Sequence, residues 1–132
     1  MTLGVTGVSE LVLEVADLER AERFYADVLG LPVVERWENR EAVWFMAGDR
    51  TRIGLWTPQV GLAGGRGGAH VHYAMHVPSD RYDAAVATLR ERGQEVEEHA
   101  FPAYQDSRAA YVTDPDGNVV EIWTWDVANH LR

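Results

Sequence analysis

The sequence predicts an α+β protein in which one βαβββ module occurs twice along the chain. Three observations predict it. The order of strand-like and helix-like segments repeats, equivalent residues recur about 62 to 67 positions later, and a glycine-rich stretch separates the two copies. A repeat of this length is too long for a solenoid unit. We therefore predict a single domain over residues 1–132, with module one at 8–57, a linker at 58–69 and module two at 70–126.

The first module begins with a strand at Val8–Val15, where apolar and polar residues alternate. Asp17 has a suitable side chain to cap the helix that follows, and Gly30 is placed to end that helix. Three short strands complete the module: Val33–Trp37, Ala42–Ala47 and Arg52–Thr57.

The second module repeats this order. Its first strand is predicted at His70–Val77, and Ser79 or Asp80 caps a helix that ends at Gly93. The last two strands flank an Asp-Pro-Asp-Gly turn at 114–117, whose Pro and Gly suit consecutive turn positions. The three closing strands are predicted at Glu95–Ala100, Ala109–Thr113 and Val119–Trp125.

Composition excludes several classes of function. The net charge of −9 argues against a nucleic-acid partner, and the absence of lysine excludes Schiff-base chemistry. With no cysteine, the chain has no disulfides, thiolate metal sites or cysteine nucleophile. The N-terminal residues lack a signal-peptide pattern and no apolar stretch approaches the ~20 residues of a membrane span, so we expect a cytoplasmic protein. The acidic surface serves either solubility or the attraction of a cationic ligand.

Two stretches carry a resemblance to a known family: S-E-L-V-L-E-V-A-D-L-E-R-A-E-R-F-Y-A-D-V-L-G-L at 9–31 and T-D-P-D-G-N-V-V-E-I-W at 113–123. Together they resemble the vicinal oxygen chelate superfamily of glyoxalase I, bleomycin-resistance proteins and extradiol dioxygenases. The resemblance covers residues 8–126. It implies that the two modules form an eight-stranded, incompletely closed barrel, and that the chain forms a homodimer.

The resemblance also places four metal-ligand positions at Glu10, Gly54, His72 and Glu121. Gly54 has no side chain to offer, so its place would fall to water or substrate. Three protein ligands with open positions are the arrangement that a catalytic metal needs. One histidine and two carboxylates admit Mn, Fe, Ni, Zn or Mg, whereas extradiol dioxygenases use two histidines and one carboxylate.

Glu14 and His76 occupy equivalent positions in the repeat, and strand alternation puts them on the faces of Glu10 and His72. They are candidate acid–base catalysts, or alternatively a buried hydrogen-bonded pair. No partner is evident for His99. Candidate substrate contacts are Trp56, Trp123, Tyr104 and Arg108.

The resemblance admits an enzyme, a binding protein, or a degenerate member that retains the fold as a dimerising module. The first is a divalent-metal-dependent enzyme that chelates vicinal oxygens of a small molecule, with lyase, isomerase or group-transfer chemistry, or extradiol-type dioxygenation. The second is a drug-binding protein without catalysis, which the charge of −9 and the five tryptophans would suit. The three matching ligand positions favour the enzyme.

Overall fold

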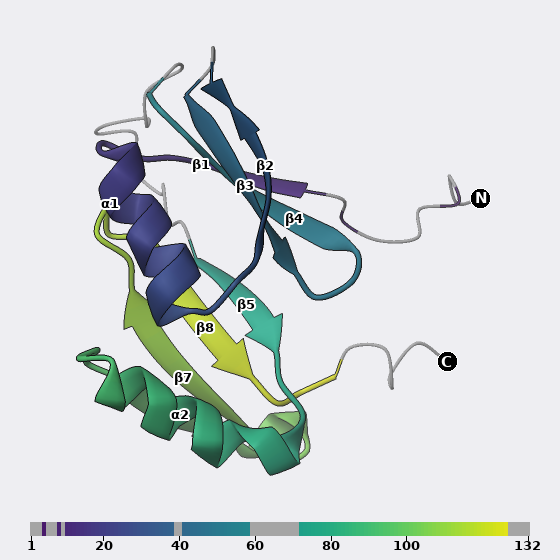
Figure 1. Ribbon diagram of the computed structural model, residues 1–132. Helices are drawn as coiled ribbons and strands as arrows, with labels where there is room; N and C mark the ends of the chain where they lie inside the picture. The colour runs from purple at the N-terminus through teal and green to yellow at the C-terminus, as the bar shows by residue number, and fades with distance from the viewer. Residues whose placement is uncertain (1–3, 5–7, 9, 39–40, 59–71, 127–132) are drawn as a thin grey trace, which may run out of the picture. The chain divides into compact units, whose positions relative to one another are not determined.

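The structure is a computed structural model that describes residues 4, 8, 10–38, 41–58 and 72–126. The chain divides into two compact units, residues 1–69 and 70–132. In its described part, each unit contains four strands and an α-helix (Figure 1). The predicted linker at 58–69 lies outside the described residues except for Pro58.

The first unit has the predicted β-α-β-β-β order. Its strands form a mixed sheet in the order β1-β4-β3-β2, in which β1 runs parallel to β4 and the other pairs are antiparallel. Asp17 caps the helix as predicted, because its side chain accepts a hydrogen bond of 3.0 Å from the Arg20 amide. Gly30 follows the helical segments in the left-handed region, with φ of 71°. The elements are β1 (Glu10–Glu14), α1 (Leu18–Arg23), the π-helical η1 (Phe24–Val28), β2 (Val33–Trp37), β3 (Ala42–Ala47) and β4 (Thr51–Trp56).

The helical segments of the first unit cover one face of its sheet. Tyr25 is fully buried and its ring centroid lies 5.9 Å from that of Phe45 on β3. The strand register then puts Ile53 on the same face as Phe45. Because strand side chains alternate, the opposite face carries Trp44 and Trp56. We call the face opposite the helix of each unit its helix-free face.

The second unit repeats the topology, with strand order β5-β8-β7-β6 and β5 parallel to β8. The predicted duplication of a βαβββ module is confirmed. The described strands thus form two separate four-stranded sheets. The elements are β5 (His72–His76), the 3₁₀ turn η3 (Ser79–Arg81), α2 (Tyr82–Glu91), β6 (Glu97–Phe101), the 3₁₀ turn η4 (Pro102–Tyr104), β7 (Ser107–Thr113) and β8 (Val119–Trp123).

The helix α2 is anchored on the sheet by Tyr82, which is 1% exposed. Its hydroxyl lies 3.0 Å from the Ala109 carbonyl oxygen and 2.9 Å from Glu98 Oε1, and these two acceptors share its one proton. Burial, together with the hydrogen bond to Glu98, raises the pKa of Tyr82 to about 12. The phenol therefore stays neutral and keeps donating throughout the physiological range.

The strand β7 begins two residues earlier than predicted. Gln105 and Asp106 both adopt left-handed backbone angles, with φ of 55° and 54°, so the chain turns sharply at non-glycine residues. Ser107 then enters the sheet buried, where its Oγ accepts a hydrogen bond of 2.9 Å from the Trp123 indole. This turn carries no glycine, so composition does not reveal where it ends.

The turn before β8 is fixed by one buried carboxylate. Asp114 Oδ1 accepts hydrogen bonds from the amides of Asp116 and Asn118 at 2.9 and 2.8 Å, and its Oδ2 accepts one of 2.8 Å from Asn118 Nδ2. Gly117 takes a φ of 86°, which favours glycine. The turn fixes the start of β8 and hence the position of Glu121 on that strand.

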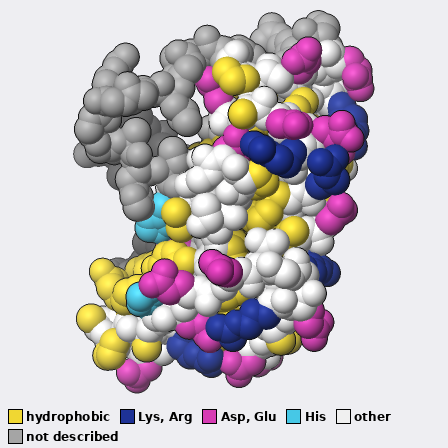
Figure 2. All heavy atoms as spheres, turned by 90° about the vertical axis from the view of Figure 1, so that its left-hand side faces the viewer, with side chains coloured by type: hydrophobic (Ala, Val, Ile, Leu, Met, Phe, Trp, Pro, Cys, Tyr) yellow, Lys and Arg dark blue, Asp and Glu magenta, His cyan; other side chains and the backbone are white. Residues whose placement is uncertain are grey.

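Acidic and basic side chains are interspersed on the face of the molecule in Figure 2. Several arginines pair with carboxylates, for example Arg23 with Glu19 at 3.1 Å and Arg90 with Glu98 at 3.1 Å. Such pairs compensate the positive charge of the arginines locally. The excess of carboxylates therefore makes the surrounding electrostatic potential negative. In the described part of the chain, no helix has the length and hydropathy to cross a membrane.

Candidate functional site

His72 and Glu121 stand next to each other on the helix-free face of the second sheet. In the parallel β5–β8 pair Ala74 lies opposite Glu121, so His72 is the diagonal neighbour of Glu121 on the same face. His72 Nε2 lies 2.7 Å from Glu121 Oε1. The Glu121 side chain is 6% exposed and that of His72 is 38% exposed. The pair therefore joins a buried carboxylate to an imidazole that solvent can reach.

Tyr111 completes this cluster from the next strand. It lies directly opposite Glu121 in the β7–β8 register, and its ring makes an edge contact with the His72 ring at a centroid distance of 6.1 Å. Burial and the negative charge of Glu121 raise the pKa of Tyr111 above its ordinary value. The phenol therefore stays neutral in the physiological range.

Glu10 is held by an arginine on the neighbouring strand of the first unit. Arg52 lies opposite Glu10 in the β1–β4 register, and its Nε and Nη2 donate to Glu10 Oε1 at 3.1 and 2.9 Å. Arg52 also donates to Glu35 at 3.3 Å, and its guanidinium stacks 3.7 Å from the centroid of a Trp44 ring. Glu10 is thus an oriented, charge-compensated carboxylate whose Arg52 contacts both go to Oε1.

The surroundings of Gly54 differ from the expectation that water or substrate would take the place of a side chain there. A Cβ placed on Gly54 would lie 2.6 Å from Cζ3 of Trp44, whose side chain is fully buried. The space that a side chain at position 54 would fill therefore holds the Trp44 indole rather than water or substrate. Gly54 is needed here because it lets the Trp44 ring lie against the backbone.

Glu14 and His76 lie on the helix-free faces, as strand alternation predicts. Glu14 is opposite Trp56 in the β1–β4 register, and His76 is opposite Trp123 in the β5–β8 register. Glu14 is half-buried and His76 is exposed. The first strand of each unit therefore carries a titratable side chain beyond its predicted metal-ligand position, on the same face.

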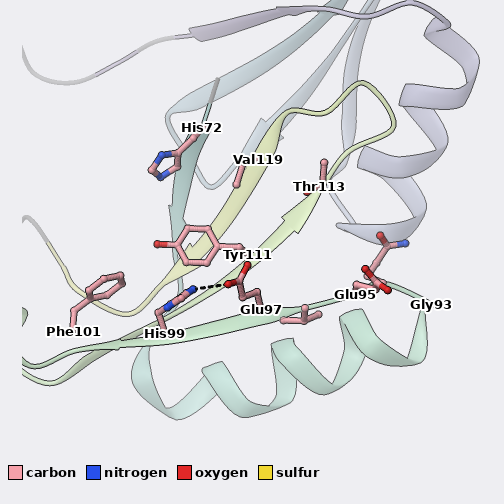
Figure 3. A pocket seen from close by; sticks show the side chains of 11 residues that line it. His72, Gly93, Glu95, Glu97, His99, Phe101, Tyr111, Thr113 and Val119 are labelled. Carbon is pink, nitrogen blue, oxygen red and sulfur yellow. Dashed lines mark hydrogen bonds and ion pairs between the residues drawn. The ribbon is translucent and has the colours of Figure 1, made fainter. Parts of the chain in front are cut away.

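The second unit has a cavity of about 970 Å³ on its helix-free face (Figure 3). His72 lines it at one side and the β6 residues Glu97 and His99 at the other, with Tyr111 between them. His99 Nε2 lies 3.1 Å from Glu97 Oε1, which supplies the partner that the sequence did not indicate. The remaining lining residues come from β6–β8 and the segment before β6: Gly93, Gln94, Glu95, Val96, Phe101, Thr113 and Val119.

The predicted aromatic contacts fall into two separate clusters. Trp56 belongs to the first unit, where its ring packs 5.5 Å from Trp37 and 6.0 Å from Trp44. Tyr104 and Trp123 belong to the second unit, with ring centroids 5.5 Å apart, and Phe101 joins them to the cavity wall. Trp123 and Tyr104 are thus placed beside the cavity.

Arg108 does not lie where the sequence suggested. Because β7 already begins at Ser107, Arg108 is a strand residue whose side chain points to the α2 face. It donates to Asp83 at 2.7 Å and stacks 4.2 Å from the Tyr82 ring centroid. Arg108 thus lies on the face of the sheet opposite this cavity, and its role in substrate binding stays a prediction.

The fit of a metal ion can be judged from the donors themselves. Two ligands at about 2.1 Å from one ion and at right angles stand about 3 Å apart. The 2.7 Å between His72 Nε2 and Glu121 Oε1 is close to that spacing, and both are donor types that divalent transition metals accept. Within the described ranges no three His, Asp or Glu side chains converge as a complete set. The second unit thus provides two adjacent donors.

The chain matches the Glyoxalase/Bleomycin resistance protein/Dioxygenase superfamily over residues 7–122. It therefore belongs to this superfamily. The lactoylglutathione lyase of Salmonella typhimurium is 32% identical over 119 residues, which span 84% of this chain and 87% of that protein. The fold and the family that the sequence predicted are both confirmed.

Solved structures agree on the fold. A lactoylglutathione lyase from Agrobacterium tumefaciens has a TM-score of 0.75 at 24% identity, covering 92% of this chain and 95% of its own. An antibiotic binding protein from a Streptomyces species has a TM-score of 0.72 at 23% identity, covering 95% of this chain and 100% of its own. At these identities the likeness shows the fold alone, which in this family hosts both enzymes and binding proteins.

Proposed function

We propose that the chain is a divalent-metal-dependent enzyme acting on a small molecule, with Glu10, His72 and Glu121 as the metal ligands. The observation that carries the proposal is the 2.7 Å contact of His72 with Glu121 at the edge of a ~970 Å³ cavity. A carboxylate this deeply buried costs free energy unless it is paired or functional. A three-ligand set of one imidazole and two carboxylates leaves positions open for substrate oxygens.

A divalent ion in this place would supply polarisation of a carbonyl and chelation of two neighbouring substrate oxygens. The protein's own residues then have separate tasks. Glu14 and His76, which lie on the same faces as the proposed ligands, would accept and return a proton. Trp123 and Tyr104 wall the site on one side and shield it from water. Lyase or isomerase chemistry needs only these parts and no redox partner.

The charge of the residues that line the cavity restricts the kind of substrate that it can bind. Its lining includes Glu95 and Glu97 and, among the described residues, no arginine. Carboxylates attract cations and repel anions, most strongly in a partly enclosed site. The site therefore favours a neutral or cationic substrate over an anionic glutathione conjugate, although the Salmonella relative is a lactoylglutathione lyase.

The proposal predicts about one divalent ion per chain after reconstitution with Mn, Fe, Ni, Zn or Mg. Metal–ligand distances from X-ray absorption should be about 2.0–2.3 Å. Elemental analysis of protein freed of excess metal gives the stoichiometry. Protein that holds none of the five metals above a buffer blank would contradict the proposal.

A binding protein without catalysis is the second candidate. The observation that favours it is the run of aromatic rings next to the acidic cavity, in which Trp125 packs 5.1 Å from Trp123 and makes an edge contact with Tyr104 at 5.5 Å. Aromatic faces beside carboxylates suit a flat cationic drug. The metal measurement separates the two candidates, because a binder of this kind needs no protein-held ion.

We further propose a homodimer. The outer strands of each sheet, β1 with β2 and β5 with β6, have hydrogen-bonding edges that the described strands leave open. A two-fold interface would bury more than ~1,000 Å² in total. Light scattering at micromolar concentration should give about twice the chain mass of 14.8 kDa. A monomer mass at that concentration would refute the dimer.

A further inference from the structure

A second histidine–carboxylate pair lines the cavity, on its β6 side. His99 Nε2 stands 3.1 Å from Glu97 Oε1, and the two side chains are 48% and 75% exposed. Because strand side chains alternate, this pair lies on the helix-free face of β6, whereas Glu98 contacts Tyr82 on the α2 face. The proposed function gives the pair no part in the chemistry.

Two aromatic neighbours restrict the plane of the His99 ring. It stacks against Phe101 at a centroid distance of 6.3 Å and an interplanar angle of 26°. It meets the Tyr111 ring edge-on at 5.4 Å and 76°. Figure 3 shows the three rings together at one side of the cavity. An imidazole with ring neighbours on two sides and a carboxylate on Nε2 has a defined orientation.

The contact with Glu97 also decides which nitrogen of His99 carries the proton. An ionised carboxylate only accepts hydrogen bonds, so Nε2 is the protonated nitrogen at this contact. In a neutral imidazole the other nitrogen, Nδ1, is then an acceptor. Among the described residues no group donates to Nδ1. A carboxylate on one ring nitrogen and a lone pair on the other are the features of an oriented general base.

We propose that His99 is a proton acceptor for the ligand in this cavity, with Glu97 as its positioning residue. A C–H or O–H bond of the ligand breaks, its proton passes to Nδ1, and its electron pair stays on the ligand. The negative charge of Glu97 then stabilises the imidazolium that has formed. This inference rests on the proposed function in that the same cavity holds the substrate, but the proton transfer itself needs no metal.

The base and the proposed metal ligands of this unit lie within reach of one small molecule. The Tyr111 ring stands between the two histidines, with its centroid 6.1 Å from that of His72 and 5.4 Å from that of His99. All three side chains line the same cavity of about 970 Å³. A molecule that binds beside His72 would therefore reach His99 across the width of one ring.

A probe reaction can test the base before the natural ligand is identified. The probe is 5-nitrobenzisoxazole, a flat and neutral molecule that suits an acidic cavity walled by aromatic rings. A base removes the proton of its acidic ring C–H bond, and that electron pair forms a nitrile as the N–O bond breaks. The product is a coloured nitrophenolate, so the rate of proton transfer is read directly from the absorbance.

The full-length chain is assayed in the presence of EDTA, so that no metal contributes. Wild type should convert the probe faster than free imidazole at the same concentration. His99→Ala should lose about tenfold or more of this rate, since a positioned base contributes about 10²- to 10⁴-fold. An exposed pair adds little to stability, so the variant should fold, as circular dichroism verifies. Equal rates of His99→Ala and wild type, or a wild-type rate no higher than that of imidazole, would overturn the proposal.

Neighbouring glutamates on β6 provide a matched control for the positioning role. Glu97→Gln and Glu98→Gln make the same chemical change on opposite faces of the strand. Glu97→Gln should lower the rate about three- to tenfold, as expected for the loss of one charge-assisted hydrogen bond, and Glu98→Gln should leave it unchanged. Nitrogen NMR should show the His99 proton on Nε2 in wild type and shared between both nitrogens in Glu97→Gln.

The two proposals fail separately. Equal rates and equal His99 tautomers in Glu97→Gln and Glu98→Gln would refute the positioning role of Glu97. A chain that retains none of the divalent metals would refute the proposed metal dependence, while the loss of rate in His99→Ala would still support His99 as the base.

Discussion

Replacing His72 by alanine is expected to abolish metal binding in protein that otherwise holds about one ion per chain. The imidazole is the one neutral nitrogen donor of the proposed set, and it stands 2.7 Å from Glu121. Without it, two carboxylates remain, one of which is engaged by Arg52. Loss of a direct ligand should exceed the ~10- to 100-fold cost of losing an outer partner. Isothermal titration with the preferred metal measures the change.

His76→Ala is the matched control for that experiment. His76 is an exposed histidine on the same strand and the same face, two alternations further along β5. Its removal should leave the stoichiometry and affinity for metal unchanged, while it tests the proton-transfer role through activity. Retention of one ion per chain by His72→Ala would show that the metal, if bound, uses other ligands.

The fold was predictable because its main signal is local and occurs twice. The alternation of β1 and β5, the Asp17 cap and the turn residues around Gly30 and Gly93 each indicate a local structure, and the repeat checks one copy against the other. Two strands, Val33–Trp37 and Ala42–Ala47, have the predicted bounds. The start of β7 was missed because the turn before it uses left-handed residues that are not glycine.

The sequence predicted which face of its strand carries each site residue, but not which of these residues are in contact. Alternation places His72 and Glu121, but their contact depends on the parallel register of strands 49 residues apart. Nothing local in the sequence marks Arg52 as the partner of Glu10, because the parallel β1–β4 pairing alone brings them together. Nor does the local sequence show that the Arg108 side chain lies on the α2 face. Because β7 already begins at Ser107, Arg108 lies within the strand, and its side chain pairs with Asp83 on the α2 face of the sheet.

Substitution at Gly54 is expected to destabilise the fold rather than to restore a fourth metal ligand. Gly54→Glu would place the carboxylate at the family's fourth ligand position, yet its Cβ would meet the buried Trp44 ring at 2.6 Å. Trp44 cannot retreat easily, since it packs 5.3 Å from Trp37 on one side and under Arg52 on the other. Overpacking of this kind costs about 1–3 kcal/mol, and displacing the indole would also disturb the Arg52 bridge to Glu10.

Urea denaturation tests whether the Trp44 ring obstructs a side chain at position 54. It compares Gly54→Ala and Gly54→Glu, each in the wild-type and the Trp44→Leu background. If it is, Gly54→Ala should lower the free energy of unfolding by about 1–3 kcal/mol in the wild type and by clearly less in the Trp44→Leu background, giving a positive coupling. Equal losses in both backgrounds would mean that Trp44 does not fill the space above Gly54. Only in the Trp44→Leu background does a glutamate at position 54 gain the room to approach a metal. A rise in metal affinity there, and not in Gly54→Glu alone, would identify Trp44 as the side chain that keeps a ligand out of position 54.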